Sequence, residues 1–124
     1  MAKVVGLGGV FVKAKNLREL RAWYVDALGI ELETWGGAQL HNQAGSYAVW
    51  AAFEQTTEYF KPSEKEFMIN FRVDDLDGLL ASLRHRGASV LDRREDTPDG
   101  CFGYVLDPEG TLIELFQPAA AAKS

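Results

Sequence analysis

Apolar and polar residues alternate most clearly along residues 67–73. The apolar positions are Phe67, Ile69, Phe71 and Val73. Asn70 and Arg72 fall between them, so a strand over this range places these polar side chains on the opposite face. The alternation therefore predicts a strand with one buried face and a second face that presents Met68, Asn70 and Arg72.

Two other stretches repeat their apolar positions every three or four residues, which predicts helices. Asn16 precedes the first stretch, and Glu19 stands three residues later, as in a capping box. Gly29 suits the end of this helix. Asp75 precedes the second stretch, whose last turn carries the basic residues 84–86 that complement a helix dipole.

The remaining segments predict short strands, so that the chain reads as strand, helix and strands, twice. The predicted strands cover residues 4–13, 30–37, 38–42 and 46–53 in the first half and 67–73, 88–92, 101–106 and 111–116 in the second. A shift of 59 residues lays Asn16 over Asp75 and Leu17 over Leu76. This correspondence indicates an internal duplication of one unit.

We therefore predict a single α+β domain over residues 1–124. Its parts are a first module at about 4–54, a connector at about 55–66, a second module at about 67–118 and a frayed tail at 119–124. Each predicted helix covers one face of a small mixed sheet. The other sheet face is then left for a different role.

Composition narrows the classes of function. The 124 residues are 47% hydrophobic and 25% charged, with a formal net charge of −5. No basic cluster stands out, so neither a nucleic acid nor an anionic membrane is an expected partner. The N-terminus lacks the zones of a signal peptide and no apolar run is long enough for a membrane span. A lone cysteine, Cys101, suits a reducing cytoplasm, which is the predicted location.

Glu114 is the most informative residue, because it stands alone in the apolar run Leu112–Phe116. A buried carboxylate must be paired, must bind a metal, or must face a wet cavity. Arg72 shares a predicted face with Asn70 and is a candidate to neutralise Glu114 or to hold an anionic ligand. A plain buried ion pair that keeps the two modules in register is the alternative.

Three segments in this order resemble the vicinal oxygen chelate superfamily, which includes glyoxalase I, extradiol dioxygenases and bleomycin-resistance proteins. They are VFVKAKNLRELRAWYVDALGI (10–30), MINFRVDDLDGLLASLRHRG (68–87) and DPEGTLIELFQP (107–118). The resemblance implies two tandem βαβββ modules that form a cup-shaped mixed β-sheet with the helices packed on the outside. It also implies a homodimer as a possible assembly.

The metal-dependent members place a His on the first strand, a His or Gln on the first strand of the second module, and a Glu on the last strand. Glu114 matches the last position, whereas Gly9 and Met68 occupy the other two. Neither binds a hard divalent cation, so no catalytic metal is expected. The alternative is a single Ni, Zn, Fe or Mn ion on Glu114 with His41 as a non-standard ligand; His85 is expected in solvent.

We expect a ligand in the cup to contact residues of the predicted inner face. The candidates are Glu114, Arg72, Asn70, Met68, His41, Trp50, Tyr104, Phe102 and Phe11. Core packing is the alternative for each aromatic residue, and we assign Trp23 and Tyr24 to the core. Cys101 is a weak candidate nucleophile, if Arg93 and Arg94 lower its pKa. Asp107 and Glu109 of the turn 107–110 are expected in solvent.

The resemblance and the missing ligands favour one function over two alternatives. The favoured function is a binding protein that encloses a small organic molecule, anionic or aromatic, without a catalytic metal. The first alternative is a divalent-metal-dependent lyase, isomerase or dioxygenase that uses Glu114. The second is a non-catalytic association module whose cup is vestigial.

Overall fold

The computed structural model describes residues 10, 12–41, 44–49 and 51–119. Its elements, in order, are α1 (Leu17–Leu28), β1 (Ile69–Arg72), α2 (Leu76–His85), β2 (Ser89–Thr97), β3 (Gly100–Leu106) and β4 (Leu112–Pro118). The fold is α+β, as the sequence predicts. Neither described helix is long and apolar enough to cross a membrane.

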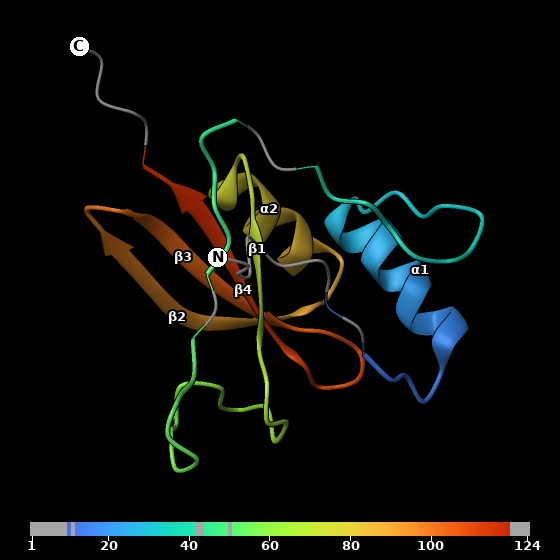
Figure 1. Ribbon diagram of the computed structural model, residues 1–124, viewed down its shortest axis with the longest axis horizontal. Coiled ribbons are helices and arrows are strands. Elements are labelled where there is room, and N and C mark those ends of the chain that lie inside the picture. The colour runs from blue at the N-terminus through green and yellow to red at the C-terminus, as the bar shows by residue number, and fades with distance from the viewer. Residues whose placement is uncertain (1–9, 11, 42–43, 50, 120–124) are drawn as a thin grey trace, which may run out of the picture.

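The strands form one mixed sheet in the order β1-β4-β3-β2 (Figure 1). β1 lies parallel to β4, and the other two pairs are antiparallel. The elements from β1 to β4 therefore form one βαβββ unit, with α2 as the crossover between β1 and the hairpin strands. This unit falls within the predicted second module, residues 67–118.

Both helices begin at the predicted caps. The Asn16 side chain accepts a hydrogen bond from the Glu19 backbone N–H (3.1 Å), and the Asp75 side chain accepts one from the Gly78 N–H (3.1 Å). Gly29 ends α1 with φ of +71°, a left-handed conformation that glycine adopts at little cost. The two caps lie at equivalent positions of the sequence repeat.

One face of the sheet packs against α2 to form the core. The fully buried side chains of this cluster are Leu76, Leu83, Val105, Ile113 and Leu115. Gly103 on β3 lets α2 approach closely, because a Cβ at this position would lie 3.0–3.2 Å from Leu80 and Leu76 side-chain atoms. Trp23 and Tyr24 of α1 pack against the same cluster, so their assignment to the core is confirmed.

The turn between β3 and β4 holds α1 against the sheet, and the predicted exposure of Asp107 is wrong. Asp107 is buried and accepts a hydrogen bond from the Tyr24 hydroxyl (2.9 Å). Glu109 accepts hydrogen bonds from the backbone N–H groups of Lys15 (2.8 Å) and Asn16 (2.9 Å). These bonds from Asn16 and Lys15 lower the pKa of Glu109. Asp107 therefore joins the body of α1 to the β3–β4 turn, and Glu109 joins the residues just before the helix to the same turn.

The described parts of residues 30–53 contain no strand, contrary to the prediction for 30–37, 38–42 and 46–53. Among the described residues, the backbone hydrogen bonds of this range are local: Ile30 N donates to Tyr24 O at the end of α1 (3.3 Å), Glu33 N to Gly37 O (2.7 Å) and Gly36 N to Glu33 O (2.9 Å). An extended segment becomes a strand only when another strand pairs with it. The predicted strand at 4–13 and the tail at 119–124 lie mostly outside the described residues.

Candidate ligand-binding site

The open face of the sheet, opposite α2, carries three polar residues in one transverse row. Glu114 on β4 stands beside Asn70 on β1 and beside Tyr104 on β3. Its chain neighbours Ile113 and Leu115 point into the core, so strand alternation turns Glu114 the other way. The predicted common face of Glu114 and Asn70 is therefore present.

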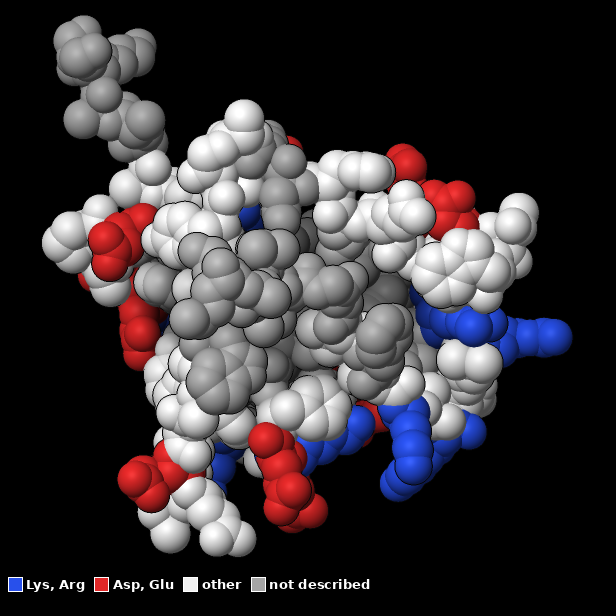
Figure 2. Space-filling view, viewed as in Figure 1, with Lys and Arg blue, Asp and Glu red and all other residues white. Residues whose placement is uncertain are grey.

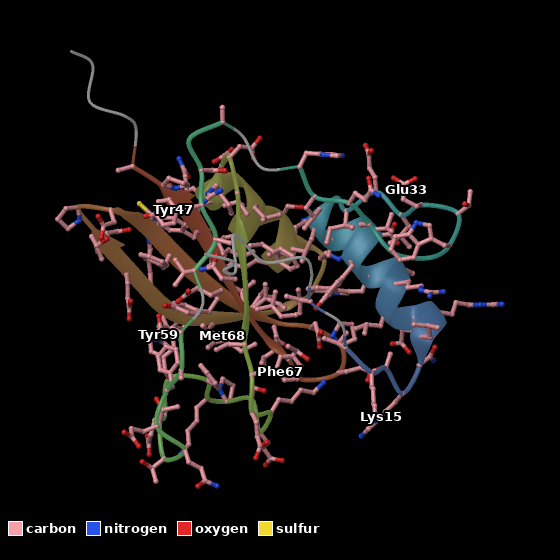
Figure 3. The ribbon with its side chains drawn as sticks, in the orientation of Figure 1. Lys15, Glu33, Tyr47, Tyr59, Phe67 and Met68 are labelled. Atoms are coloured by element: carbon pink, nitrogen blue, oxygen red, sulfur yellow. The ribbon has the colours of Figure 1, made fainter. Side chains whose placement is uncertain are left out.

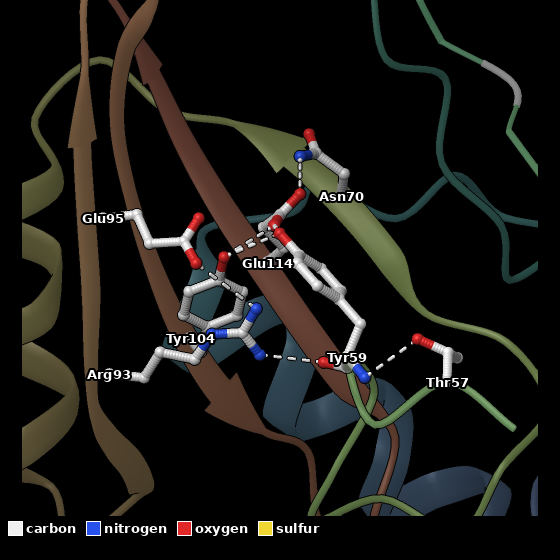
Figure 4. A network of polar contacts seen from close by, with 7 residues as sticks. All are labelled: Thr57, Tyr59, Asn70, Arg93, Glu95, Tyr104 and Glu114. Atoms are coloured by element: carbon white, nitrogen blue, oxygen red, sulfur yellow. Dashed lines mark hydrogen bonds and ion pairs between the residues drawn. The ribbon is translucent and has the colours of Figure 1, made fainter. Parts of the chain in front are cut away.

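Glu114 is a buried residue, 6% exposed, and the hydrogen bonds to its carboxylate come from uncharged donors (Figure 4). Asn70 Nδ2 donates to Oε1 (2.7 Å). The hydroxyl groups of Tyr104 (2.8 Å) and Tyr59 (2.5 Å) both donate to Oε2. A buried carboxylate is strongly disfavoured unless it is hydrogen-bonded, and these three donors meet that requirement without a cation.

Tyr59 comes from the connector and was not among the sequence candidates. Its ring lies 4.1 Å from the guanidinium carbon of Arg93, which lies at the same distance from the Tyr104 ring. Arg93 Nη1 also donates to the Tyr59 carbonyl oxygen (2.8 Å), and Nη2 lies 3.5 Å from Glu95 Oε1. A cation between two aromatic faces is a favourable arrangement. The only sequence signal was an aromatic pair, Tyr59–Phe60, within a polar segment.

Both tyrosine hydroxyls of the site are held in the neutral form. Burial raises the pKa of Tyr104 most, and its hydrogen bonds with Tyr59 and Glu114 raise it further. Burial also raises the pKa of Tyr59, followed by the hydrogen bond to Glu114. The phenols therefore act as hydrogen-bond donors at neutral pH.

Arg72 does not pair with Glu114, so that part of the prediction is wrong. Arg72 Nη2 donates to the Tyr47 carbonyl oxygen (2.6 Å) instead, and the ion pairs among the described residues do not include it. The amide of Asn70, two residues earlier on β1, takes the predicted place beside Glu114. Sequence register identified the face correctly but could not decide which polar side chain reaches the carboxylate.

A groove of about 2260 Å³ runs over the open face and is lined by Asn70 and Glu114 of the polar row, whereas the candidate Tyr104 is fully buried and does not line it. Asn70, Arg72, Phe102 and Glu114 line it, and the rings of Phe102 and Phe116 stack there with centroids 4.6 Å apart. Tyr47 lies toward one end of the sheet in Figure 3, and Tyr59 toward the other. Charged side chains of both signs surround the centre of the face seen in Figure 2.

The other sequence candidates fall into two groups. Met68 is half-buried and His41 is exposed, and both line the groove. Gly9, Phe11 and Trp50 lie outside the described residues. His85 is exposed in the last turn of α2, as expected.

Cys101 is not activated as a nucleophile. It packs against the core on the helix side of the sheet. A hydrogen bond to Asp96, followed by burial, raises the pKa of the Cys101 thiol, whereas the sequence hypothesis required a lowered pKa. Arg94, which pairs with Asp77 and Asp96, lowers the pKa of the thiol, but its effect is smaller than those of Asp96 and burial. A raised pKa lowers the thiolate fraction at neutral pH.

The residues around Glu114 do not fit a divalent metal ion. Among the described residues, no three His, Cys, Asp or Glu side chains converge. Both oxygens of Glu114 already accept hydrogen bonds, and Met68 offers only a soft thioether. The sequence has glycine at the remaining superfamily position, residue 9, so no side chain supplies a ligand there.

Several solved structures share the fold. TnmS3, an antibiotic binding protein from Streptomyces sp. CB03234, is 26% identical, with 87% of this chain and 91% of that chain covered and a TM-score of 0.55. An integron cassette protein from Vibrio cholerae is 16% identical, with coverage of 96% and 99% and a TM-score of 0.64. A glyoxalase/bleomycin resistance protein/dioxygenase superfamily member from Sphaerobacter thermophilus is 19% identical, with coverage of 94% and 98% and a TM-score of 0.55.

No curated protein matches the chain in sequence. The family model described as a glyoxalase-like domain matches residues 9–116, which is most of the chain. This match and the solved structures confirm the resemblance to the vicinal oxygen chelate superfamily. The protein therefore belongs to the glyoxalase-like domain family.

Proposed function

We propose that this protein binds a small organic molecule in the groove over the open sheet face, without a resident catalytic metal ion. The observation that carries the proposal is the state of Glu114. At the position where metal-dependent relatives are expected to hold an ion, the carboxylate is buried and accepts hydrogen bonds from Asn70, Tyr59 and Tyr104. A carboxylate in this state can line the bottom of a binding site for an organic molecule, but it is a poor ligand for a metal ion.

The lining of the groove supports this function. Ligand sites combine apolar and aromatic walls with a few placed polar groups. Here the stacked pair Phe102–Phe116 forms an aromatic wall one row away from the polar row of Glu114. The similarity to TnmS3, an antibiotic binding protein, supports the same class of function.

We further propose that residues 4–54 complete a cup of two βαβββ modules and that the protein forms a homodimer in the cytoplasm. Apolar side chains of the first module are exposed in the single chain, and a partner surface would cover them. They include Val10 (61%), Trp35 (65%), Leu40 (60%) and Val49 (70%). Light scattering during gel filtration tests the dimer: a mass near 13.7 kDa at micromolar concentration would contradict it.

A metal-dependent lyase, isomerase or dioxygenase requires ligands that the described residues do not bring together. A vestigial association module requires a filled cup, whereas the open face carries a groove of about 2260 Å³. Neither alternative is therefore favoured by a specific observation.

The test is a thermal-shift screen of aromatic and anionic metabolites, run in parallel with and without EDTA. A ligand that binds only the folded state raises the melting temperature, with about 2.7 kcal/mol of stabilisation at a concentration of 100 Kd. We expect hits whose shifts are equal in both series, and titration calorimetry then gives their Kd. Hits that appear only after Ni²⁺, Zn²⁺, Fe²⁺ or Mn²⁺ is added would overturn the metal-free proposal.

Two variants locate the binding site of any hit. Phe102→Ala removes one ring of the aromatic wall and is expected to weaken binding at least severalfold. Leu17→Ala truncates an apolar side chain on α1 that is 50% exposed and lies outside the groove lining, so it is expected to leave Kd unchanged. Equal Kd values in both variants would place the ligand elsewhere.

A further inference from the structure

Tyr59 lies between the groove and the polar row formed by Asn70, Glu114 and Tyr104. Its hydroxyl donates to Glu114 Oε2 (2.5 Å) and lies 2.9 Å from the Tyr104 hydroxyl. Its ring lies against the Arg93 guanidinium (4.1 Å) and stacks with Phe53 (centroids 5.4 Å apart, 28° between planes). Figure 4 shows this ring over the polar row, between Arg93 and Asn70. The connector thus places a phenol on the site.

Tyr59 is the residue that attaches the connector, residues 55–66, to the sheet. Among the described residues, the hydrogen bonds between residues 55–66 and the sheet are made by Tyr59, through its hydroxyl group and its carbonyl oxygen. The other backbone hydrogen bonds of the segment are local, such as Lys61 N to Glu58 O (3.2 Å) and Ser63 N to Phe60 O (3.0 Å). Tyr59 itself is only half-buried. A competitor for its place therefore has to break the contacts of this one residue, including the hydrogen bond from Arg93 to its carbonyl oxygen, and no strand pairing.

The floor of the site selects an uncharged hydrogen-bond donor. Glu114 accepts hydrogen bonds, so a carboxylate or phosphate in place of Tyr59 would face a like charge. The nearest cation, Arg93, already contacts Glu95 and the Tyr59 carbonyl. Burial and the hydrogen bond to Glu114 raise the pKa of Tyr59, so a phenol held there stays protonated.

We propose that the ligand is an aryl compound with a free hydroxyl group, and that this hydroxyl replaces that of Tyr59 on Glu114 and releases residues 55–66 from the sheet. The inference rests on the proposed binding function and specifies its ligand class. It replaces the expectation of an anionic ligand, which required a free Arg72. The ring of the ligand takes over the contact that the Tyr59 ring makes with Arg93.

Three probes with one ring system test the ligand class by titration calorimetry: 2-naphthol, naphthalene and 2-naphthoate. With the unmodified protein, 2-naphthol is expected to bind about tenfold more tightly than naphthalene, because a hydrogen bond to a charged acceptor contributes about that factor. 2-Naphthoate is expected to bind most weakly. Equal or tighter binding of 2-naphthoate would overturn the proposal.

Three variants test the replacement of Tyr59. Tyr59→Phe keeps the ring and removes the competing hydroxyl, so a ligand that replaces this side chain no longer breaks its hydrogen bond to Glu114, and 2-naphthol and naphthalene should each bind about tenfold more tightly. Tyr59→Ala also frees the ring's space, so both probes should gain. Glu58→Gln is the matched control: its side chain is 79% exposed and bonds only Lys61, and all three affinities should stay within twofold. An unchanged 2-naphthol affinity in Tyr59→Phe would overturn the inference.

Hydrogen exchange supplies an independent measurement. Binding of 2-naphthol should speed amide exchange in residues 55–66, whereas increased protection there would contradict the replacement. If no naphthyl probe binds but the metabolite screen yields a ligand, the inference fails and the proposed function stands. If neither the probes nor the screen yields binding, both fail.

Discussion

The two halves of the chain carry the same sequence pattern but differ in how far that pattern is realised within one copy. In the second half, residues 69–118 form four paired strands around α2, and the apolar side chains of the core are fully buried. In the first half, α1 forms with the predicted cap, but the described residues of 30–53 have no strand partner. Leu40, Tyr47 and Val49 are 60–70% exposed there.

The difference shows that alternation of apolar and polar residues predicts which side chains share a face of a strand, but does not predict which strand pairs with it. A helix makes its backbone hydrogen bonds within its own segment, so a capping residue and the apolar periodicity are enough to predict α1 and α2. A strand makes its backbone hydrogen bonds with a neighbouring strand, and the whole fold decides which strand that is. β1 has β4 as its neighbour, although 44 residues separate Asn70 from Glu114.

The strongest test of the contrast compares one leucine from each half. Leu115→Ala removes a fully buried side chain from the core and should lower the free energy of unfolding by about 2–5 kcal/mol. Leu40→Ala removes a side chain that is 60% exposed and should change it by less than about 0.5 kcal/mol. Urea unfolding followed by circular dichroism measures both.

The stability of Leu40→Ala shows whether the exposed side chains of the first half are covered in solution. A loss of about 2 kcal/mol or more would contradict its exposure in solution. If that loss grew as the protein was diluted, a second copy would be the covering surface, because dimer stability depends on protomer concentration. A loss independent of concentration would place the cover within the chain.

The second test addresses the contact between the two halves, where Tyr24 of α1 donates a hydrogen bond to Asp107 in the β3–β4 turn. Tyr24→Phe keeps the ring that packs edge-on against Phe71 and removes only the hydrogen bond to Asp107. Asp107 Oδ1 retains its bonds from the backbone N–H groups of Glu109 (2.8 Å) and Thr111 (3.0 Å), whereas Oδ2 loses the bond from Tyr24. We therefore expect a loss of about 1.5 kcal/mol, the lower end for a hydrogen bond to a charged group.

The control and the pH dependence make this test specific. Tyr47→Phe, at a residue that is 70% exposed, should have no measurable effect on unfolding. Burial, followed by the charge of Asp107, raises the pKa of Tyr24 in the folded state. Its contribution is therefore complete below about pH 10, the ordinary tyrosine pKa, and is lost as the pH rises above it. A stability difference between wild type and Tyr24→Phe that grew above pH 10 would contradict this assignment.

The candidate site shows where sequence reasoning succeeds and where it stops. Register along 67–73 and 111–116 placed Asn70, Arg72 and Glu114 on one face, because strand alternation has a fixed period. The contacts of side chains within that face depend on their length and on what lies above them. Asn70 reaches Glu114, whereas the longer Arg72 extends to the Tyr47 carbonyl.

Residues outside regular elements were the main omissions. Tyr59 sits in a polar connector without periodicity, and only the fold brings it to Glu114, 55 residues away. Asp107 and Glu109 fit a tight turn, which explains their positions but gives no indication of their partners on α1. A loop residue is placed by tertiary contacts, and a single sequence contains no local signal for them.

The smallest test locates the boundary between the two regions. Asn16→Ala and Asp75→Ala remove equivalent caps of α1 and α2, and each should cost about 1 kcal/mol if both helices unfold with the sheet. Arg18→Ala, exposed in the first turn of α1, is the control and should have little effect. We expect equal losses, because Tyr24 and Glu109 tie α1 to the β3–β4 turn.

Equal losses would place the boundary after Gly29, so that α1 belongs to the same cooperative unit as residues 69–118 although it lies in the other half of the sequence. If Asn16→Ala left the unfolding midpoint unchanged while Asp75→Ala lowered it, α1 would unfold separately from the sheet. The boundary would then lie in the connector, between the two copies of the repeat. The two cap variants therefore distinguish a unit defined by contacts from a unit defined by sequence duplication.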